Sequence, residues 1–159
     1  MLSKSPGMRA RAGWLLLLSG LVGCAPAPPS LKSLTEIHEV SRPRWNRQGD
    51  LAYLSDESGQ VRAHVRRAGG ASAQAALANV TLAAWNPQAD LLTLQYDPDG
   101  SENSQLMGWE PASGKLQPAA IKPGIIHHFG TYSRRGRLAY SSNERSPADF
   151  DVYLDGQRL

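Results

Sequence analysis

The chain has 159 residues, of which 17 are lysine or arginine and 14 are aspartate or glutamate. Three of the basic residues lie in segment 1–23, which has the layout of an export signal, so the rest of the chain carries 14 charges of each sign. This balance gives no support to nucleic-acid binding, and we expect no nucleic-acid partner. About 136 residues remain after the signal, enough for one modest domain with its own core.

Residues 1–23 are predicted to be an export signal. Lys4, Arg9 and Arg11 form a positive head, and the apolar run from Trp14 to Val22 is too short to span a bilayer as a helix. Small residues follow this run, as they do at a signal cleavage site. We therefore expect the mature chain to begin near residue 24.

The cleavage region is more specific than an ordinary signal. Leu21-Val22-Gly23-Cys24 resembles the bacterial lipoprotein lipobox, and this resemblance implies that Cys24 becomes the lipidated first residue of the mature protein. Cys24 is the only cysteine, so it has no partner for an internal disulfide, and lipid attachment accounts for it. The alternative is an ordinary secretory signal cut near Ala25-Pro26-Ala27, which would discard Cys24.

The residue after the cysteine bears on localisation. Ala25 stands where enterobacterial lipoproteins retained in the inner membrane carry aspartate. The resemblance therefore implies attachment to the outer membrane, with the domain facing the periplasm. Segment 24–37 is rich in proline and is predicted to be a tether, because proline opposes both helix and strand.

From residue 38 onward the sequence favours strands separated by turns. No window of sufficient length has apolar residues at helical spacing. The alanine-rich stretch Ala71–Ala78 is predicted to be a short outer strand or a loop. Short apolar runs bounded by turn-forming residues are typical of an all-β chain, and they are Leu51–Leu54, Val61–Val65, Leu91–Tyr96, Leu106–Trp109, Leu138–Ser141 and Val152–Leu154.

One motif occurs three times: an aromatic residue, a small polar residue, a short turn and a hydrophobic run. The copies begin at Trp45, at Trp85 and at Tyr132. A period of roughly 40 residues indicates repeated units that bury their faces against one another. The aromatic residue is large enough to pack between neighbouring sheets, so Trp45 and Trp85 are predicted to lie in the core, while the place of Trp109 stays open.

The turn after each aromatic residue has its own chemistry. Gly49 and Gly136 can adopt the left-handed conformation that ends such a turn. Ala89 takes the place of this glycine in the second copy, so the middle turn is predicted to be different or strained. The polar residues that can accept a backbone N–H at the turn entry are Asn46, Asn86 and Ser133.

Each copy can be divided into strands. The first copy gives 42–46, 51–55, 61–67 and 74–77, and the second gives 80–86, 91–96, 105–110 and 115–118. The third gives 125–133, 137–142 and 151–154, and it is predicted to lack a fourth strand. The fold class is therefore predicted as all-β, with about three four-stranded antiparallel sheets of which the last is incomplete.

These motifs resemble the WD40-like repeat of TolB-like β-propellers and of the amino-terminal propellers of prolyl-oligopeptidase-family enzymes. The family pattern is roughly Trp-Ser-Pro-Asp-Gly, a strand ending in serine, then Asp-Ile-Tyr. Its serine position is held by Asn46, Asn86 and Ser133, and its proline position by Pro87. The third copy is the most similar, to dipeptidyl aminopeptidase and acylaminoacyl peptidase propellers. The resemblance covers 38–159 and implies a partial β-propeller.

The resemblance leaves two interpretations of function. Propellers close with about four to eight blades, whereas three are predicted here. The related enzymes carry an α/β-hydrolase domain after the propeller, and this sequence contains no Gly-x-Ser-x-Gly motif. We therefore predict a non-catalytic, lipid-anchored periplasmic module that binds a protein or peptide, with self-association through open blade edges. The alternative is the amino-terminal propeller of a serine peptidase whose catalytic domain is missing.

No catalytic residue, cofactor or metal site is predicted, which leaves Cys24 as the one predicted site. His127 and His128 are neighbours on a strand and point to opposite faces, so they are not expected to share a metal ion. Loop 97–103 begins like a calcium loop, but its glycine stands at the fourth position, and a polar hairpin loop is predicted instead. Other charged residues are predicted at strand edges or in solvent: Asp149, Asp151, Arg66, Arg67, Arg134 and Arg135.

Overall fold

The computed structural model describes residues 38–159, and all regular secondary structure in this part is β-strand. The predicted signal 1–23, the lipidation site Cys24 and the tether 24–37 lie outside the described residues. Within the described part, no helix is long and apolar enough to cross a membrane. The predicted all-β class is confirmed for this part of the chain.

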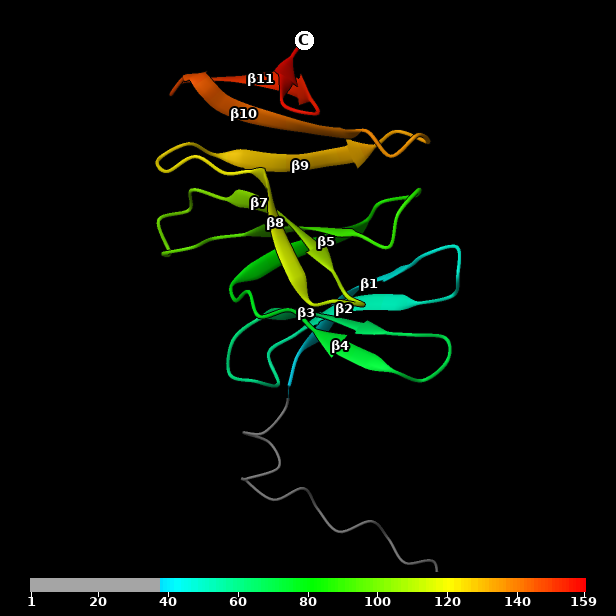
Figure 1. Cartoon of the computed structure of the whole chain (residues 1–159). Coiled ribbons are helices and arrows are strands. Elements are labelled where there is room, and N and C mark those ends of the chain that lie inside the picture. The colour runs from blue at the N-terminus through cyan, green and yellow to red at the C-terminus, as the bar shows by residue number, and fades with distance from the viewer. Residues whose placement is uncertain (1–37) are drawn as a thin grey trace, which may run out of the picture. The chain divides into compact units, whose positions relative to one another are not determined.

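The strands form three four-stranded antiparallel sheets, in which each strand pairs with its neighbour in sequence (Figure 1). Sheet 1 consists of β1 (Val40–Trp45), β2 (Leu51–Ser55), β3 (Arg62–Arg66) and β4 (Ser72–Gln74). Sheet 2 consists of β5 (Val80–Trp85), β6 (Leu92–Tyr96), β7 (Gln105–Glu110) and β8 (Lys115–Ala120). Sheet 3 consists of β9 (His127–Tyr132), β10 (Leu138–Ser146), β11 (Asp149–Leu154) and β12 (Gln157–Arg158).

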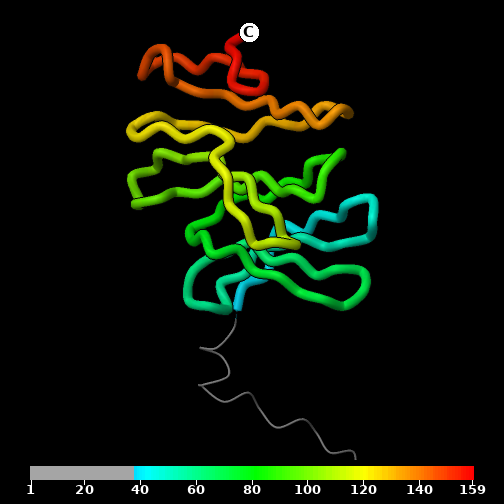
Figure 2. The backbone as a smooth tube through the Cα atoms, viewed as in Figure 1, coloured from blue at the N-terminus to red at the C-terminus, as the bar shows by residue number. Residues whose placement is uncertain are grey.

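The sheets stack in chain order, with sheet 2 in the middle (Figures 1 and 2). The first strand of each later sheet packs on the sheet before it: β5 contacts β1, β2 and β3, and β9 contacts β6 and β7. Over residues 38–159 the stack does not close into a ring. Sheet 1 and sheet 3 therefore each present one face to a neighbour and one face away from it.

The prediction that the third unit lacks a fourth strand is wrong. Gln157 pairs with Leu154 and Arg158 with Tyr153, so β12 completes sheet 3. The two residues before it, Asp155 and Gly156, both have positive φ, which reverses the chain within two residues. A strand of two residues has no apolar periodicity, and this is why the sequence pattern does not reveal it.

The core consists of two layers, one on each side of sheet 2. The strands of sheet 2 contribute alternate residues to the two layers, as the pleat requires. The layer between sheets 1 and 2 is the larger and includes Ala52, Leu54, Val65, Leu92, Leu94 and Trp109. The layer between sheets 2 and 3 includes Leu106, Ala120, Leu138, Tyr140 and Tyr153.

The three repeated aromatic residues do not share one environment. Trp85 and Tyr132 are partly buried and pack against the two core layers, which confirms the prediction for Trp85. Trp45 is 68% exposed, so the prediction that it lies in the core is wrong. Within the described residues no sheet lies before sheet 1 to cover it. Trp109 is 1% exposed and lies in the core between sheets 1 and 2.

The predicted turn chemistry is confirmed. Asn46 Oδ1 accepts the N–H groups of Gln48 at 3.0 Å and Asp50 at 2.8 Å. Asn86 Oδ1 accepts the Gln88 N–H, and Ser133 Oγ accepts the Arg137 N–H, at 2.9 and 3.1 Å. Each polar side chain therefore closes its own turn by holding backbone donors that the strands leave free.

The middle turn differs from the others, as predicted. Gly49 and Gly136 have φ of 82° and 78°, whereas Ala89 is not among the residues with positive φ. The middle turn is also longer, because Trp85 pairs with Leu92, seven residues on. Trp45 and Tyr132 each pair with a residue six positions on, Leu51 and Leu138. The extra residue relieves the need for a left-handed conformation at Ala89.

We predict that Gly136→Ala destabilises the protein more than Gly49→Ala does. Both substitutions place a side chain at positive φ, which costs about 1 kcal/mol. A Cβ at Gly136 would also lie 2.8 Å from Asn86 Oδ1, whereas a Cβ at Gly49 meets only Ala68 Cβ at 3.7 Å. The extra loss at position 136 is expected to be about 1–2 kcal/mol in urea-unfolding free energy. Equal losses for the two variants would contradict this account.

Candidate functional site

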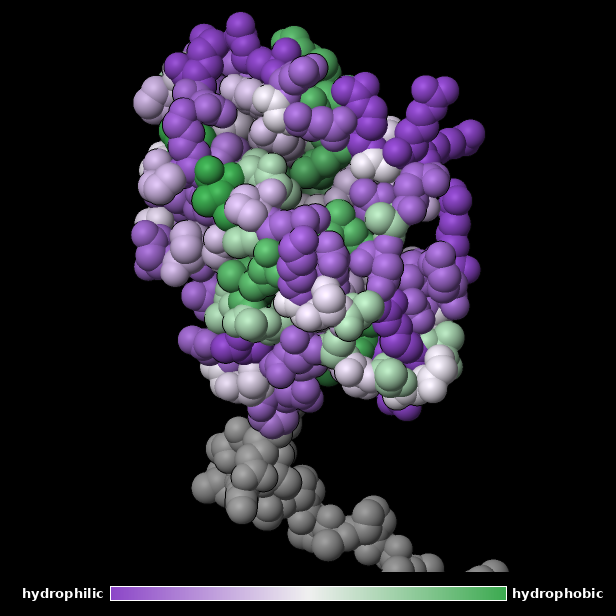
Figure 3. All heavy atoms as spheres, in the orientation of Figure 1, coloured by the Kyte–Doolittle hydropathy of each residue, from purple (hydrophilic) through white to green (hydrophobic). Residues whose placement is uncertain are grey.

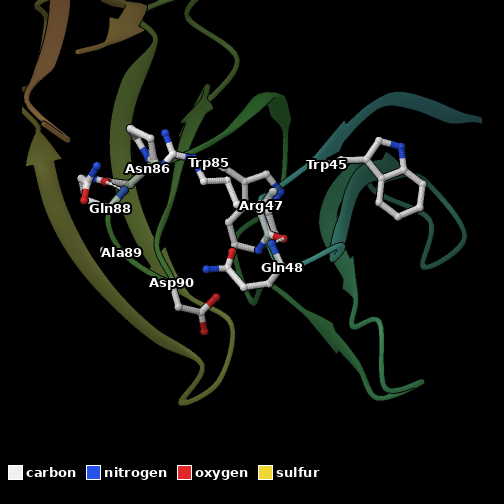
Figure 4. Close-up of a pocket in the computed structure, with 10 residues that line it drawn as sticks. Trp45, Arg47, Gln48, Trp85, Asn86, Gln88, Ala89 and Asp90 are labelled. Atoms are coloured by element: carbon white, nitrogen blue, oxygen red, sulfur yellow. Dashed lines mark hydrogen bonds between the residues drawn. The ribbon is translucent and has the colours of Figure 1, made fainter. Parts of the chain in front are cut away.

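A cleft lies between the turns that follow the first two repeated aromatic residues (Figure 4). Its volume is about 540 Å³, within the range of pockets that take small ligands or short peptide segments. Ten residues line it, and they are 45–48 from the first turn and 85–90 from the second. The site is therefore built from two copies of the same sequence motif.

The cleft exists because equivalent asparagines make different bonds. Asn86 Nδ2 donates to the Gly136 carbonyl at 3.1 Å, and Gln88 Nε2 donates to the Arg134 carbonyl at 2.6 Å, so the second and third turns are tied together. Asn46 Nδ2 instead donates to Asp50 Oδ2 in its own turn, at 3.0 Å. The Asn46 amide is thus used within the first turn, and among residues 38–159 the Gln48 amide makes no hydrogen bond to the second turn, so the two turns remain apart.

An ion-pair network joins sheets 1 and 2 beside the cleft. Arg67 binds Asp90 with both terminal nitrogens, at 2.7 and 2.6 Å, and its Nη1 also lies 2.9 Å from Asp50 Oδ2. The other oxygen of Asp50 accepts the Ala68 N–H at 2.9 Å. Arg67 is therefore an inter-sheet link, which corrects the prediction that it is a solvated residue. Its predicted companions Arg66, Arg134 and Arg135 are exposed.

The network sets the protonation of its members. The Ala68 N–H, then the Asn46 amide and the Arg67 guanidinium, hold the pKa of Asp50 below its ordinary value. The Asp90 carboxylate, with Asp50, raises the pKa of Arg67. Asp50 is 7% exposed, so its negative charge is compensated inside the protein and not by water. Arg67 carries one positive charge and Asp50 and Asp90 carry one negative charge each, so the network as a whole has a net charge of −1.

Two side chains of the first turn are available to a ligand. Arg47 and Gln48 are exposed, and within residues 38–159 neither side chain makes a hydrogen bond or ion pair. Trp85 is committed, because its indole N–H donates to the Arg44 carbonyl at 3.2 Å. Trp45 points away from the other labelled residues (Figure 4). A ligand would thus meet the Arg47 guanidinium, which donates hydrogen bonds, and the Gln48 amide, which both donates and accepts them.

A second cleft of about 280 Å³ lies at the opposite ends of the sheet 2 strands and is lined in part by Tyr96 and Pro123. Gln105 ties its wall together. The Gln105 amide donates to the Ile125 carbonyl at 2.7 Å, and its oxygen accepts the Lys122 N–H at 2.8 Å. The buried amide is fully used in holding two loops, so this cleft offers a ligand less polar chemistry than the first.

The histidine pair lies on opposite faces of β9, as predicted. His127 is 2% exposed and its ring meets the Tyr140 ring edge-on at 5.7 Å. His128 is exposed and stacks on Phe150 at 5.5 Å. Neither ring nitrogen of His127 has a hydrogen-bond partner within the described residues, and burial lowers the pKa of this histidine. His127 is therefore a neutral core residue.

The two acidic regions considered in the sequence are structural. The Asp97 carboxylate accepts the N–H groups of Asp99, Gly100 and Glu102, which confirms a polar hairpin loop that uses its own carboxylate. Asp149 and Asp151 lie on β11 and bind Arg145. Among residues 38–159 no three histidine, cysteine, aspartate or glutamate side chains are grouped to hold a metal ion.

Comparisons with known proteins leave the family open. A scan against protein-family models gives no match, and a search of curated proteins gives no match either. The resemblance to WD40-like propeller repeats therefore rests on the repeated motif residues, and the site has to be interpreted from its own geometry.

We predict that Asp50→Asn lowers the unfolding free energy by about 2 kcal/mol at neutral pH, because it removes a charge that Arg67 and Ala68 compensate. Since the pKa of Asp50 is lowered in the folded protein, its stabilisation is complete above pH about 4 and is lost as the pH falls through the folded pKa. The difference between wild type and variant should therefore shrink below pH about 4. Urea unfolding measured across pH tests this.

The matched control for this prediction is Asp149→Asn. Asp149 is exposed and meets Arg145 only at 3.5 Å, so its substitution is expected to change stability by less than about 0.5 kcal/mol. A stability difference for Asp50→Asn that stayed constant from neutral to acidic pH would contradict the assignment of a lowered pKa.

Proposed function

We propose that this protein is a lipid-anchored, propeller-like module that holds an extended segment of another protein at the periplasmic face of the outer membrane. It acts by binding and performs no catalysis itself. The sequence supports the anchor through the lipobox-like segment ending at Cys24, and the motif repeats support the propeller-like fold. The observation that carries the binding proposal is the cleft between the first and second turns, lined by Arg47 and Gln48, whose side chains make no hydrogen bond or ion pair to any residue of 38–159.

The cleft is a better binding site than the sheet edges, which are the other surface considered for this function. Exposed strand edges recruit other strands when they are long and flat. Two of the outer strands are short, because β4 has three residues and β12 has two, while β8 has six. The outer edges of sheets 1 and 3 thus offer a partner strand few unpaired backbone groups. The cleft instead offers unpaired side-chain groups in a concave site.

The chemistry of the cleft suits a peptide that carries a carboxylate. The Arg47 guanidinium can bind a carboxylate with two parallel hydrogen bonds. The Gln48 amide can pair with a backbone amide, donating to its carbonyl and accepting from its N–H. Both oxygens of Asp90 accept hydrogen bonds from Arg67, and because Arg67 also pairs with Asp50 the network keeps one net negative charge beside the cleft, which Arg47 has to outweigh. The ligand class is therefore an extended peptide segment with an acidic side chain or a free C-terminus.

The anchor is tested by metabolic labelling. We expect cells producing the wild-type chain to incorporate labelled palmitate into it and cells producing Cys24→Ser to incorporate none. Because Cys24 is the only cysteine, label that persisted in the variant would rule out the lipidated cysteine and leave the ordinary secretory signal.

Binding is tested with a phage-displayed library of random linear peptides, selected on the full chain carrying Cys24→Ser in mild detergent. We expect enriched peptides to contain aspartate, glutamate or a free C-terminal carboxylate. Their affinity, measured by fluorescence anisotropy, is expected to fall about tenfold in Arg47→Ala and in Gln48→Ala.

The control variant is Arg135→Ala, which removes an exposed arginine of the third turn, at the position equivalent to Gln48 and outside the cleft. It is expected to leave peptide affinity unchanged. If no peptide were enriched, or if Arg47→Ala and Arg135→Ala weakened binding equally, the cleft would not be the binding site.

A further inference from the structure

The second cleft, of about 280 Å³, lies between loop 97–103 and segment 121–124, which follows β8. Its walls are largely apolar, and Pro98, Ile121 and Pro123 contribute to them. By contrast, hydrophilic side chains cover much of the face of the molecule that Figure 3 shows. The volume is just below that of pockets for drug-sized ligands, which begin at about 300 Å³. The cleft therefore suits a group about the size of one amino-acid side chain.

Tyr96 brings an unpaired hydroxyl to this cleft. It is the last residue of β6 and pairs with Gln105 at the start of β7, so both side chains lie on the same face of sheet 2. Tyr96 is 8% exposed, and its hydroxyl makes no hydrogen bond within residues 38–159. The hydroxyl is not among the polar atoms sealed from solvent, and Tyr96 lines the second cleft. The buried side chain therefore presents its hydroxyl to the cleft.

Apart from the tyrosine hydroxyl, the side-chain donors around the cleft are used within the protein, whereas acceptors remain. Gln105 Nε2 donates to the Asn103 and Ile125 carbonyls, at 3.0 and 2.7 Å. Asn103 Nδ2 donates to Ser101 Oγ at 3.0 Å, and the Ser101 hydroxyl donates to Asp99 Oδ1 at 2.5 Å. Within residues 38–159 Asp99 Oδ2 and Asn103 Oδ1 accept no hydrogen bond. A ligand in the cleft is therefore expected to bring hydrogen-bond donors.

The charge around the cleft is negative. The loop after β6 carries Asp97, Asp99 and Glu102, and no cationic side chain of residues 38–159 pairs with them. The lysine that follows β8, Lys122, is committed to Glu144, with Nζ and Oε1 2.7 Å apart. The acidic side chains are nevertheless not grouped to hold a metal ion in this part of the chain. The negative charge is therefore spread along one side of the cleft, which suits a cation with an organic body.

We propose that the second cleft binds an alkylammonium group, with its aliphatic chain against the apolar walls and its charged head beside the Asp99 carboxylate. An ammonium carries three N–H donors. The cleft presents three acceptors without a partner among residues 38–159, namely Asp99 Oδ2, Asn103 Oδ1 and the Tyr96 hydroxyl. A bond from an ammonium to a carboxylate is charge-assisted and stronger than one between neutral groups. The apolar walls shield the aliphatic chain from water.

Two sources supply this chemistry: a lysine side chain of a partner protein and a free diamine. Burial raises the pKa of Tyr96, so its hydroxyl stays neutral where an ammonium is charged. The site lies at the opposite ends of the sheet 2 strands from the cleft between the first two turns. Binding of a cation here therefore goes beyond the peptide binding proposed for that cleft and does not depend on it.

The test is a titration followed by amide NMR shifts, on the isotope-labelled full chain carrying Cys24→Ser in a non-ionic detergent. The probes are cadaverine and Nα-acetyl-lysine methylamide, which both carry an alkylammonium group. Each is expected to shift the amide signals of Gly100 and Gly124 in a saturable manner. Nα-acetyl-norleucine methylamide has the same aliphatic chain without the charge, and we expect it to bind about tenfold more weakly than the lysine derivative. Tighter binding of one probe than of the other identifies the source, and either order supports the proposal.

Two variants test the contacts. Asp99→Asn removes a charge from an exposed residue, and the affinity of both probes is expected to fall about tenfold. Tyr96→Phe removes the hydroxyl and keeps the ring in the core, so a fall of about threefold to fivefold is expected. The matched control is Glu102→Gln, which removes the same charge from the same loop at a residue that does not line the cleft. It is expected to change affinity by less than about twofold, since salt screens exposed charges at a distance.

Four results would overturn the proposal. The absence of a saturable shift with both probes would mean that the cleft binds no alkylammonium. Equal affinity for the norleucine derivative would indicate an apolar ligand. Equal losses in Asp99→Asn and Glu102→Gln would mean that only the overall charge of the loop attracts the probe. Displacement of the probe by calcium chloride at constant ionic strength would indicate a metal ion. None of these results bears on peptide binding, which is measured through Arg47 and Gln48.

Discussion

The contact between a repeated aromatic residue and the preceding sheet is the interaction on which the rest of the structure depends. Trp85 and Tyr132 each combine a large apolar surface with one polar atom, and each uses both. The ring fills space between two sheets, while the polar atom bonds to a fixed point on the earlier sheet. Burial alone would allow the sheets to slide, since it has no direction. The hydrogen bond is directional and helps to fix the register of the stack, together with the Arg67 ion pairs between sheets 1 and 2 and the bonds of Asn86 and Gln88 to the third turn.

The turns around this contact decide where the surface opens. The asparagine that closes the turn is shared by the first two copies, but its amide has two possible uses. In the first turn the buried Asp50 carboxylate accepts a hydrogen bond from the Asn46 amide and also pairs with the Arg67 guanidinium. In the second turn the Asn86 amide bonds to the next turn. Asp90 stands at the same place in the second turn but binds Arg67, which leaves the Asn86 amide for the third turn. The two turns therefore differ in the partners of equivalent side chains.

Sequence patterns predicted the strands and turns well because both depend on neighbouring residues. The turn residues Asn46, Asn86 and Ser133 act on N–H groups a few positions away, and the strand β7 was predicted with its observed bounds. The exposure of Trp45 could not be predicted in the same way, since it depends on whether another sheet lies before it. The role of Arg67 was missed for a similar reason: its partner Asp90 is 23 residues away and belongs to another sheet.

A stack built from a directional contact always has two unlike ends. Every sheet has one face of the kind whose aromatic residue packs on a preceding sheet and one face of the kind on which a following sheet packs. Adding further sheets therefore still leaves one uncovered face at each end of the stack. Trp45 at one end and Phe150 and Val152 at the other are the surfaces that this geometry leaves uncovered over residues 38–159. Only closure brings the two ends together, whether the additional sheets come from another chain or from further repeats. The exposed tryptophan thus follows from the same interaction that orders the interior.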